Sequence, residues 1–186
     1  MRLAPFSVCV FCGSRYGVNP GHRAAARDLG VALAEAEMRL VYGAGDVGLM
    51  GELARAAQAA GGETFGVIPQ HLLAREVGRR DLSTFVVTET MHERKKVMFM
   101  NADVLVALPG GPGTLDELFE VLTWRQLGLH AKPVFLLDAG GYWEPLLGLL
   151  RHMVGEGFAE PSFLDFLAPV ADVPALMEAL TAVRPA

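Results

Sequence analysis

The stretch Asp103–Glu120, DVLVALPGGPGTLDELFE, contains the pattern that decides the fold of this chain. The apolar run Val104–Leu108 is long enough for a strand and is apolar on both faces of it. Pro109 and three glycines then end the strand, and helical spacing begins at once. The stretch therefore predicts a buried strand, a tight glycine-rich loop and a helix in direct succession.

The same succession repeats along the chain. Strands are predicted in SVCVFCG, RLVYG, ETFGVIP, STFVVTET, DVLVALPG, KPVFLLD and, as a last short strand, LAPV. Segments with helical spacing separate them, without a linker or an internal repeat. Strands that are apolar on both faces and alternate with helices form parallel sheets covered on both sides. We predict a doubly wound α/β fold in a single domain, residues 1–186.

The composition excludes several classes of function. The chain has 186 residues, 52% hydrophobic, and a net charge of −5, which suits one domain with a large core. A nucleic-acid-binding protein usually has a basic excess, so no nucleic-acid partner is expected. No apolar run approaches the ~18 residues of a membrane span, and the N-terminus lacks the shape of a signal peptide. We therefore expect a cytoplasmic protein with no membrane partner.

Cys9 and Cys12 form a C-x-x-C pair, but the pattern does not favour a redox or zinc site. A redox pair normally opens a helix, whereas these two residues lie in an apolar strand and point to opposite faces. The chain has no second cysteine pair to complete a zinc site. We expect reduced, partly buried thiols and no metal.

The loops that follow the strands form the candidate site, because ligands of doubly wound sheets bind outside the carboxyl ends of the strands. The loop Gly43–Gly48, GAGDVG, fits the dinucleotide pattern G-x-G-x-x-G. It follows the second strand rather than the first, and no acid lies about 20 residues later to bind a ribose hydroxyl. We interpret it as a tight turn that lets another ligand approach.

The loop Pro109–Thr114 is a stronger candidate for an anion site. Unpaired amides and the helix dipole at the start of the following helix both favour an anion, and the Thr114 hydroxyl could add a further donor. No lysine follows the last glycine, so this is not a P-loop. The segment TLDE is, however, also a capping box in which Glu117 reaches back to the amide of Thr114. The spacing leaves open whether Glu117 is a structural or a chemical acid.

The helix that starts in this loop has two apolar faces. One face holds Leu115, Leu118, Phe119 and Leu122, and the other includes Val121 and Trp124. Such a helix is covered twice, by the sheet and by a second partner. We therefore expect a homodimer.

MHERKK, Met91–Lys96, opens the helix after the fourth strand with three cations and a histidine. Positive charge at a helix N-terminus opposes the helix dipole. A charge run of this kind is often a solvated surface. Alternatively, a facing anion or carboxylate offsets the cost, and Glu117 and Glu76 are acids that the fold could bring close.

Three segments together, YGAGDVGLMG, MHERK and PGGPGTLDE, resemble the LONELY GUY (LOG) family. The family pattern P-G-G-x-G-T-x-x-E matches from Pro109 to Glu117, and M-H-x-R-K matches from Met91 to Lys95. The likeness runs from VFCGS to EGF, nearly the whole chain. Members are cytokinin-activating nucleoside 5′-monophosphate phosphoribohydrolases, often mislabelled lysine decarboxylases.

The resemblance implies a Rossmann-like fold, usually a homodimer, and hydrolysis of the N-glycosidic bond of AMP or an N6-substituted AMP without a cofactor. It implies that Arg94 and Glu117 are catalytic. The substrate-binding residues that it implies are Glu76, Lys95, Gly110, Gly111, Gly113, Thr114, Thr123, Gly43, Gly45, Gly13 and Ser14. Ala44, Asp46 and Arg15 depart from the residues common in the family, and we expect them to alter substrate contacts or range rather than the reaction.

Two other functions remain to be weighed. A non-catalytic carrier of a phosphorylated ligand, such as molybdenum cofactor, needs the phosphate cradle but not the pair Arg94 and Glu117. A pyridoxal phosphate-dependent lysine decarboxylase needs a Schiff-base lysine with supporting groups. The pair therefore favours the hydrolase over the carrier, and the short chain with three lysines disfavours the decarboxylase.

Overall fold

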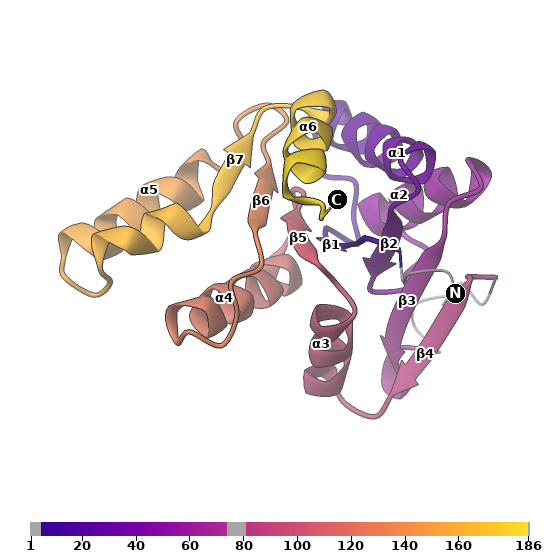
Figure 1. Ribbon diagram of the computed structural model, residues 1–186, viewed down its shortest axis with the longest axis horizontal. Coiled ribbons are helices and arrows are strands. Elements are labelled where there is room, and N and C mark those ends of the chain that lie inside the picture. The colour runs from indigo at the N-terminus through magenta and orange to yellow at the C-terminus, as the bar shows by residue number, and fades with distance from the viewer. Residues whose placement is uncertain (1–4, 74–80, 186) are drawn as a thin grey trace.

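One parallel sheet forms the centre of the protein, as the computed structural model shows for residues 5–73 and 81–185 (Figure 1). The strands pair in the order β4-β3-β2-β1-β5-β6-β7, and each neighbouring pair is parallel. Their bounds are β1 (Ser7–Phe11), β2 (Arg39–Tyr42), β3 (Thr64–Pro69), β4 (Thr84–Thr88), β5 (Val104–Ala107), β6 (Val134–Leu137) and β7 (Ala168–Val170). The predicted doubly wound α/β fold is confirmed.

Helices cover both faces of this sheet (Figure 1). On one face α1 (Pro20–Glu35), α2 (Gly48–Ala59) and α6 (Val173–Val183) enclose one apolar core. On the other face α3 (Met91–Met100), α4 (Pro112–Gln126) and α5 (Glu144–Gly155) enclose a second core. Two short 3₁₀ helices, η1 (Gln70–Leu72) and η2 (Pro161–Phe166), complete the described elements. All predicted strands occur within a few residues of their expected bounds, and helices separate them as predicted.

The two cysteines confirm how β1 is placed between these cores. Cys9 packs into the core under α3 and α4, whereas Cys12 packs into the core under α1 and α2. Both thiols are buried and free. Burial raises the pKa of each thiol well above its usual range, and the carboxyl group of Glu117 raises it further. The prediction that the two thiols point to opposite faces is confirmed, but both are fully rather than partly buried.

The strand order reverses between β1 and β5, and this reversal positions the site. From β1 the chain passes through α1 to β2 on one side, whereas from β5 it passes through α4 to β6 on the other. The loops after these two strands meet, since the amide of Gly13 donates to the carbonyl of Pro109 at 3.1 Å. A crevice at such a reversal is the usual ligand site of doubly wound sheets.

Across residues 5–73 and 81–185, no helix is long and apolar enough to span a membrane. Glu76, expected to contact the substrate, lies outside the described residues.

Candidate active site

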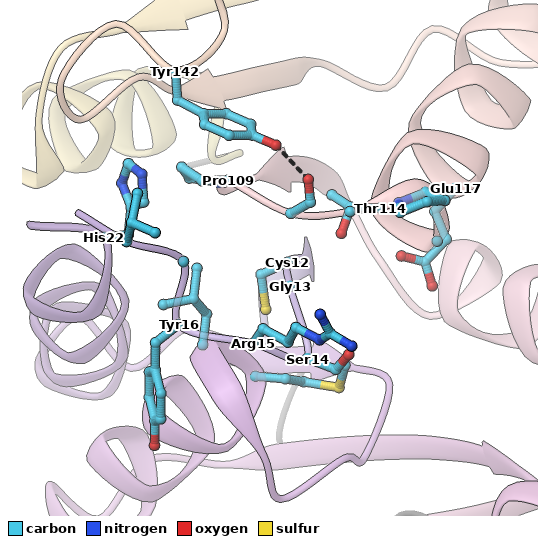
Figure 2. A pocket seen from close by; sticks show the side chains of 18 of the residues that line it. Cys12, Gly13, Ser14, Arg15, Tyr16, His22, Pro109, Thr114, Glu117 and Tyr142 are labelled. Atoms are coloured by element: carbon cyan, nitrogen blue, oxygen red, sulfur yellow. Dashed lines mark hydrogen bonds between the residues drawn. The ribbon is translucent and has the colours of Figure 1, made fainter. Parts of the chain in front are cut away.

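A cleft of about 750 Å³ opens where the strand order reverses (Figure 2). Its walls are the loop after β1 (residues 12–18), the first turns of α1 and α2, Arg94 of α3, the loop after β5 with the start of α4, and Tyr142. Pockets for small organic ligands usually measure about 300–1,000 Å³. The cleft is therefore large enough for a nucleotide.

Helix α4 points its uncapped N-terminus into this cleft. Gly111 is the N-cap residue, Pro112 is the first helical residue, and no side chain caps the helix. Because the first amides of a helix have no partner within it, those of α4 remain available to a ligand. The helix carries no acid in its first turn, so nothing there competes with an anion.

The predicted capping box at Thr114 and Glu117 is wrong. Proline suits the first helical position, so α4 begins at Pro112, ahead of Thr114. Thr114 is then the third helical residue, and Glu117 lies in the second turn, too far along to reach the N-cap amide. The structure has a capping box at α3 instead, where Thr90 and Glu93 exchange hydrogen bonds with each other's amides. Glu117 is free of the capping role.

The three glycines of the loop have different physical roles. A Cβ at Gly110 would lie 2.0 Å from the Thr114 hydroxyl oxygen, so Gly110 is required by packing. A Cβ at Gly111 or Gly113 would meet no atom within 4 Å, and neither glycine has a positive φ. Neither the backbone nor the packing therefore requires glycine at these two positions. The side-chain-free space lies at the uncapped amides, where a ligand would sit.

Glu117 is a buried carboxyl group beside this N-terminus. Its side chain is 10% exposed and lines the cleft. Burial raises the pKa of Glu117 from 4.5 to about 7, although the nearby charge of Arg94 lowers it. A carboxyl group with a pKa near neutrality can exchange a proton or act as an anion at physiological pH.

Arg94 is held beside Glu117 by two backbone carbonyls. Its Nε donates to Val67 O at 3.1 Å and its Nη2 donates to Gly43 O at 3.0 Å, while Nη1 lies 4.0 Å from Glu117 Oε1. Val67 lies within β3, and Gly43 directly follows the neighbouring strand β2. A Cβ at Gly43 would lie 1.8 Å from Nη2. Gly43, the first glycine of the YGAGDVG loop, therefore leaves the space that the guanidinium occupies.

The cations of MHERKK are only partly a solvated surface. His92 and Lys96 are exposed, but Arg94 and Lys95 are buried. The Lys95 ammonium lies 3.0 Å from Asp116 and 3.2 Å from Glu120 on α4. The interpretation as facing carboxylates is confirmed for Arg94 and Lys95, although Asp116 and Glu120 were not foreseen as the partners of Lys95.

Several residues expected at the substrate lie outside the cleft. Gly13, Ser14, Gly110, Gly111, Gly113 and Thr114 line the cleft, as do Arg94 and Glu117. Lys95, Thr123, Gly43 and Gly45 are not among its lining residues. Thr123 instead borders a shallow hollow on the outer face of α4, and the Gly45 amide contacts the Met50 sulfur. Substrate contacts by these four residues stay predictions.

The three departures from the family pattern also differ in position. Asp46 pairs with Arg55 at 2.7 Å on α2, and Ala44 is buried with a φ of +57°. Neither lines the cleft, whereas Arg15 does.

Two kinds of comparison with known proteins identify the family. A family model described as "Possible lysine decarboxylase" matches residues 50–180. Over 173 residues the chain is 45% identical to a probable cytokinin riboside 5′-monophosphate phosphoribohydrolase of Oryza sativa subsp. japonica, covering 93% of this chain and 76% of that protein. The chain belongs to the LOG family.

A further relative of this LOG protein has the same description, and solved structures share its fold. It is 42% identical over 178 residues to a cytokinin riboside 5′-monophosphate phosphoribohydrolase of Arabidopsis thaliana, covering 96% of this chain and 82% of that protein. Among solved structures it is similar to the Moco carrier protein of Chlamydomonas reinhardtii, with a TM-score of 0.73 and 23% identity over 96% of this chain and 97% of that one. The molybdenum cofactor binding protein of Rippkaea orientalis has a TM-score of 0.73 at 20% identity, covering 98% of this chain and 99% of that one. At such identity the structural likeness shows the fold alone.

Sequence reasoning missed two aromatic residues of the LOG cleft, His22 and Tyr142. His22 lies in the first turn of α1, and the Tyr142 hydroxyl donates to the carbonyl of Gly110. Both line the cleft. In the sequence, His22 follows the loop after the first strand. Its position near a carboxyl end of the sheet was the signal that could have found it.

Proposed function

We propose that this LOG protein hydrolyses the N-glycosidic bond of a nucleoside 5′-monophosphate, AMP or an N6-substituted AMP, giving the free base and ribose 5-phosphate. The observation that carries the proposal is the buried pair of Glu117 and Arg94 beside the uncapped N-terminus of α4. The names of the rice and Arabidopsis relatives support the same substrate class.

The 5′-phosphate would bind at the start of α4. The amides of Gly113 and Thr114 and the Thr114 hydroxyl are suitable donors, and Ser14 faces them from the loop after β1. The space that glycine leaves open at positions 111 and 113 is the space that phosphate oxygens would fill. Because Glu117 is one helical turn further along α4, a ribose attached to this phosphate reaches its carboxyl group.

Glu117 supplies the negative charge that the reaction needs. Breaking an N-glycosidic bond develops positive charge on the ribose, as in glycoside hydrolysis. The ionised carboxylate stabilises this charge from a buried position, where electrostatic interactions are strong. Water adds its hydroxyl to C1′, and its remaining proton accompanies the departing base. Arg94, anchored by the carbonyls of Gly43 and Val67, positions Glu117 and favours its ionised form.

The positions of the lysines argue against a lysine decarboxylase. The chain has three lysines, Lys95, Lys96 and Lys132, and none lines the cleft. Lys95 is engaged by Asp116 and Glu120, while Lys132 donates to carbonyls at the end of α3. No lysine is therefore placed to form a Schiff base with a cofactor in the cleft.

We further propose a homodimer through the outer face of α4. Leu115, Phe119 and Trp124 are only partly buried there and border a shallow hollow with Thr123. The ion pairs of Lys95 lie on the same side of the helix. A substrate contact by Thr123 would require this face of one subunit to adjoin the cleft of another.

The test is incubation of the purified protein with AMP and with isopentenyl-AMP, followed by chromatography for free base and ribose 5-phosphate. The wild type is expected to release both products from at least one substrate, and the ratio of kcat/KM values identifies the preferred base. Glu117→Gln keeps the side-chain shape but removes the charge, and we expect a folded protein at least 100-fold less active.

Glu178→Gln is the matched control, since Glu178 is exposed on α6, away from the cleft. It should retain wild-type activity. Full activity of Glu117→Gln would disprove the catalytic role. Release of no base by the wild type, with tight binding of a phosphorylated ligand, would favour a carrier.

A further inference from the structure

Three backbone amides are available to an anion at the start of α4. Gly111 is the N-cap residue, and Pro112, which has no amide hydrogen, is the first helical residue. The amides of Gly111, Gly113 and Thr114 therefore have no partner within the helix. An anion is bound well only when all three point to the same place, so the orientation of the peptide that carries the Gly111 amide matters as much as its position.

The orientation of this peptide is fixed by a side chain that is distant in sequence. The Tyr142 hydroxyl donates to the carbonyl oxygen of Gly110. Because a peptide unit is planar and trans, its N–H points in the direction opposite to its carbonyl. The amide of Gly111 consequently points away from Tyr142.

Figure 2 shows what lies on that opposite side. Tyr142 reaches the glycine loop from one side, and Ser14 of the loop after β1 lies on the other, with Thr114 between them. Ser14 and Thr114 both line the cleft. The bond from Tyr142 thus directs the carbonyl of Gly110 out of the space between the two loops and the amide of Gly111 into it. A rotated peptide would instead present a carbonyl oxygen there, which repels a phosphate.

The neighbours of Tyr142 hold its ring in place. Gly140 and Gly141, with φ of +87° and +75°, lie in the turn between β6 and α5 that leads to it. Trp143 is 1% exposed, and its ring N–H donates to a carbonyl of β6 at 3.2 Å. The Tyr142 ring packs edge-on against Trp143, with centroids 4.9 Å apart, and against His22 at 5.6 Å. The hydroxyl is therefore directed at the glycine loop before a ligand binds.

We propose that Tyr142 is a positioning residue for phosphate binding, which holds the carbonyl of Gly110 and so orients the amide of Gly111 toward the nucleotide's 5′-phosphate. The identity of that anion rests on the proposed function. A donor that is oriented in advance loses less freedom when the ligand arrives, so the affinity is higher.

Tyr142→Phe tests this role, because it keeps the ring and its edge contacts but removes the hydroxyl. Calorimetry with ribose 5-phosphate measures binding without a hydrolysis step. We expect the affinity to fall about fivefold, since one neutral hydrogen bond is lost. In the turnover of AMP, KM should rise by a similar factor with kcat nearly unchanged, because the phosphate is bound equally in the ground state and the transition state.

The mobility of the loop separates positioning from direct contact. Nitrogen-15 relaxation of the ligand-free protein should give a lower order parameter for the Gly111 amide in Tyr142→Phe than in the wild type. Thr181→Val is the matched control, because it removes a hydroxyl that donates to Met177 O within α6, away from the cleft. It should change neither the affinity nor the order parameter.

A lower affinity with an unchanged order parameter would show that the hydroxyl contacts the phosphate itself, and would overturn the positioning role. Wild-type affinity of Tyr142→Phe would overturn it as well, even when the wild type hydrolyses AMP. If ribose 5-phosphate binds in a manner that depends on Tyr142 but the wild type releases no base, the proposed function fails and the positioning role stands. Absence of ribose 5-phosphate binding by the wild type would overturn the positioning role.

Discussion

Glu117 illustrates how one residue can satisfy two sequence patterns. In sequence it completes both a capping box and the P-G-G-x-G-T-x-x-E motif. The start of α4 at Pro112 removes the capping role, and burial beside Arg94 leaves a carboxyl group with a raised pKa. Spacing could not separate the two, because a shift of the N-cap from Thr114 to Gly111 decides between them.

The raised pKa of Glu117 predicts a pH-dependent stability. Because its folded-state pKa of about 7 exceeds the unfolded value of 4.5, the folded protein binds more protons between these values. Stability therefore falls as pH rises through this window and levels off above about pH 7. Glu117→Gln lacks this dependence, so its free energy of unfolding relative to wild type should rise by about 2–3 kcal/mol between pH 5 and pH 8.

Urea denaturation at one protein concentration, repeated across this pH range, measures the difference. Parallel pH profiles for the two proteins would show that Glu117 is not perturbed.

Gly43 is predicted to act through Arg94. Its Cβ in Gly43→Ala would lie 1.8 Å from Nη2, so the guanidinium must move away from the carbonyls that hold it. Misplacement of a catalytic group by about 1 Å can cost about 100-fold in rate. We expect kcat/KM to fall by about 100-fold. The melting temperature, measured by circular dichroism, should change little.

Gly148→Ala on α5 is the matched control, because a Cβ there meets no atom within 4 Å. It should retain activity. Wild-type activity of Gly43→Ala would contradict the role of Arg94 in the site.

At the scale of elements, the start of α3 shows how a cationic helix N-terminus is stabilised. Thr90 and Glu93 form a capping box there, and the Glu93 carboxylate accepts from the amides of Glu89 and Thr90. This negative charge in the first turn offsets part of the cost of Arg94, Lys95 and Lys96 near the positive end of the helix dipole. The helix that presents Arg94 therefore begins with a capping box, whereas α4 has none.

Thr90→Ala is predicted to destabilise the protein by about 1 kcal/mol, since the amide of Glu93 loses its acceptor. Thr181→Ala provides the comparison, because the Thr181 hydroxyl donates to Met177 O within α6 and caps nothing. Its free energy of unfolding should stay within about 0.5 kcal/mol of wild type. Equal losses in urea denaturation would refute the capping contribution.

At the scale of the whole molecule, α4 carries apolar residues both against the sheet and on its outer face. Leu118, Val121 and Leu122 are buried against the sheet, whereas Leu115 and Phe119 border the shallow hollow. The sequence predicted two apolar stripes but divided them differently, since it grouped Leu115 and Phe119 with Leu118 and Leu122. Which stripe meets the sheet depends on how the helix is rotated, and the packing against β1 and β5 decides that.

Phe119→Glu is predicted to turn the proposed homodimer into a folded monomer, because a charge would be buried without a partner in the interface. Sedimentation velocity measures the change. Phe158→Glu, at an exposed phenylalanine beyond α5, should remain dimeric. A monomeric wild type, or a dimeric Phe119→Glu, would exclude this interface.

The cytoplasmic location expected from composition stays a prediction.

The sequence alone determined the layers of this protein and the loops that form its cleft. Apolar strands such as Val104–Ala107 alternate with helical segments. This periodicity is a local property, so it can be recognised in the sequence without knowledge of tertiary contacts. Since all carboxyl ends of a parallel sheet share one edge, the convergence of the glycine loop with the loop after β1 followed from the same pattern.

Tertiary structure alone decided what each residue of the site does. The proximity of Arg94 to Glu117, the clash that requires Gly43, and the hydrogen bond of Tyr142 to Gly110 depend on atoms that are distant in sequence. The raised pKa of Glu117 likewise results from burial by the surrounding chain. Periodicity can position a helix on a sheet, but only the packed structure sets distances of a few ångströms and the degree of burial on which charge and chemistry depend.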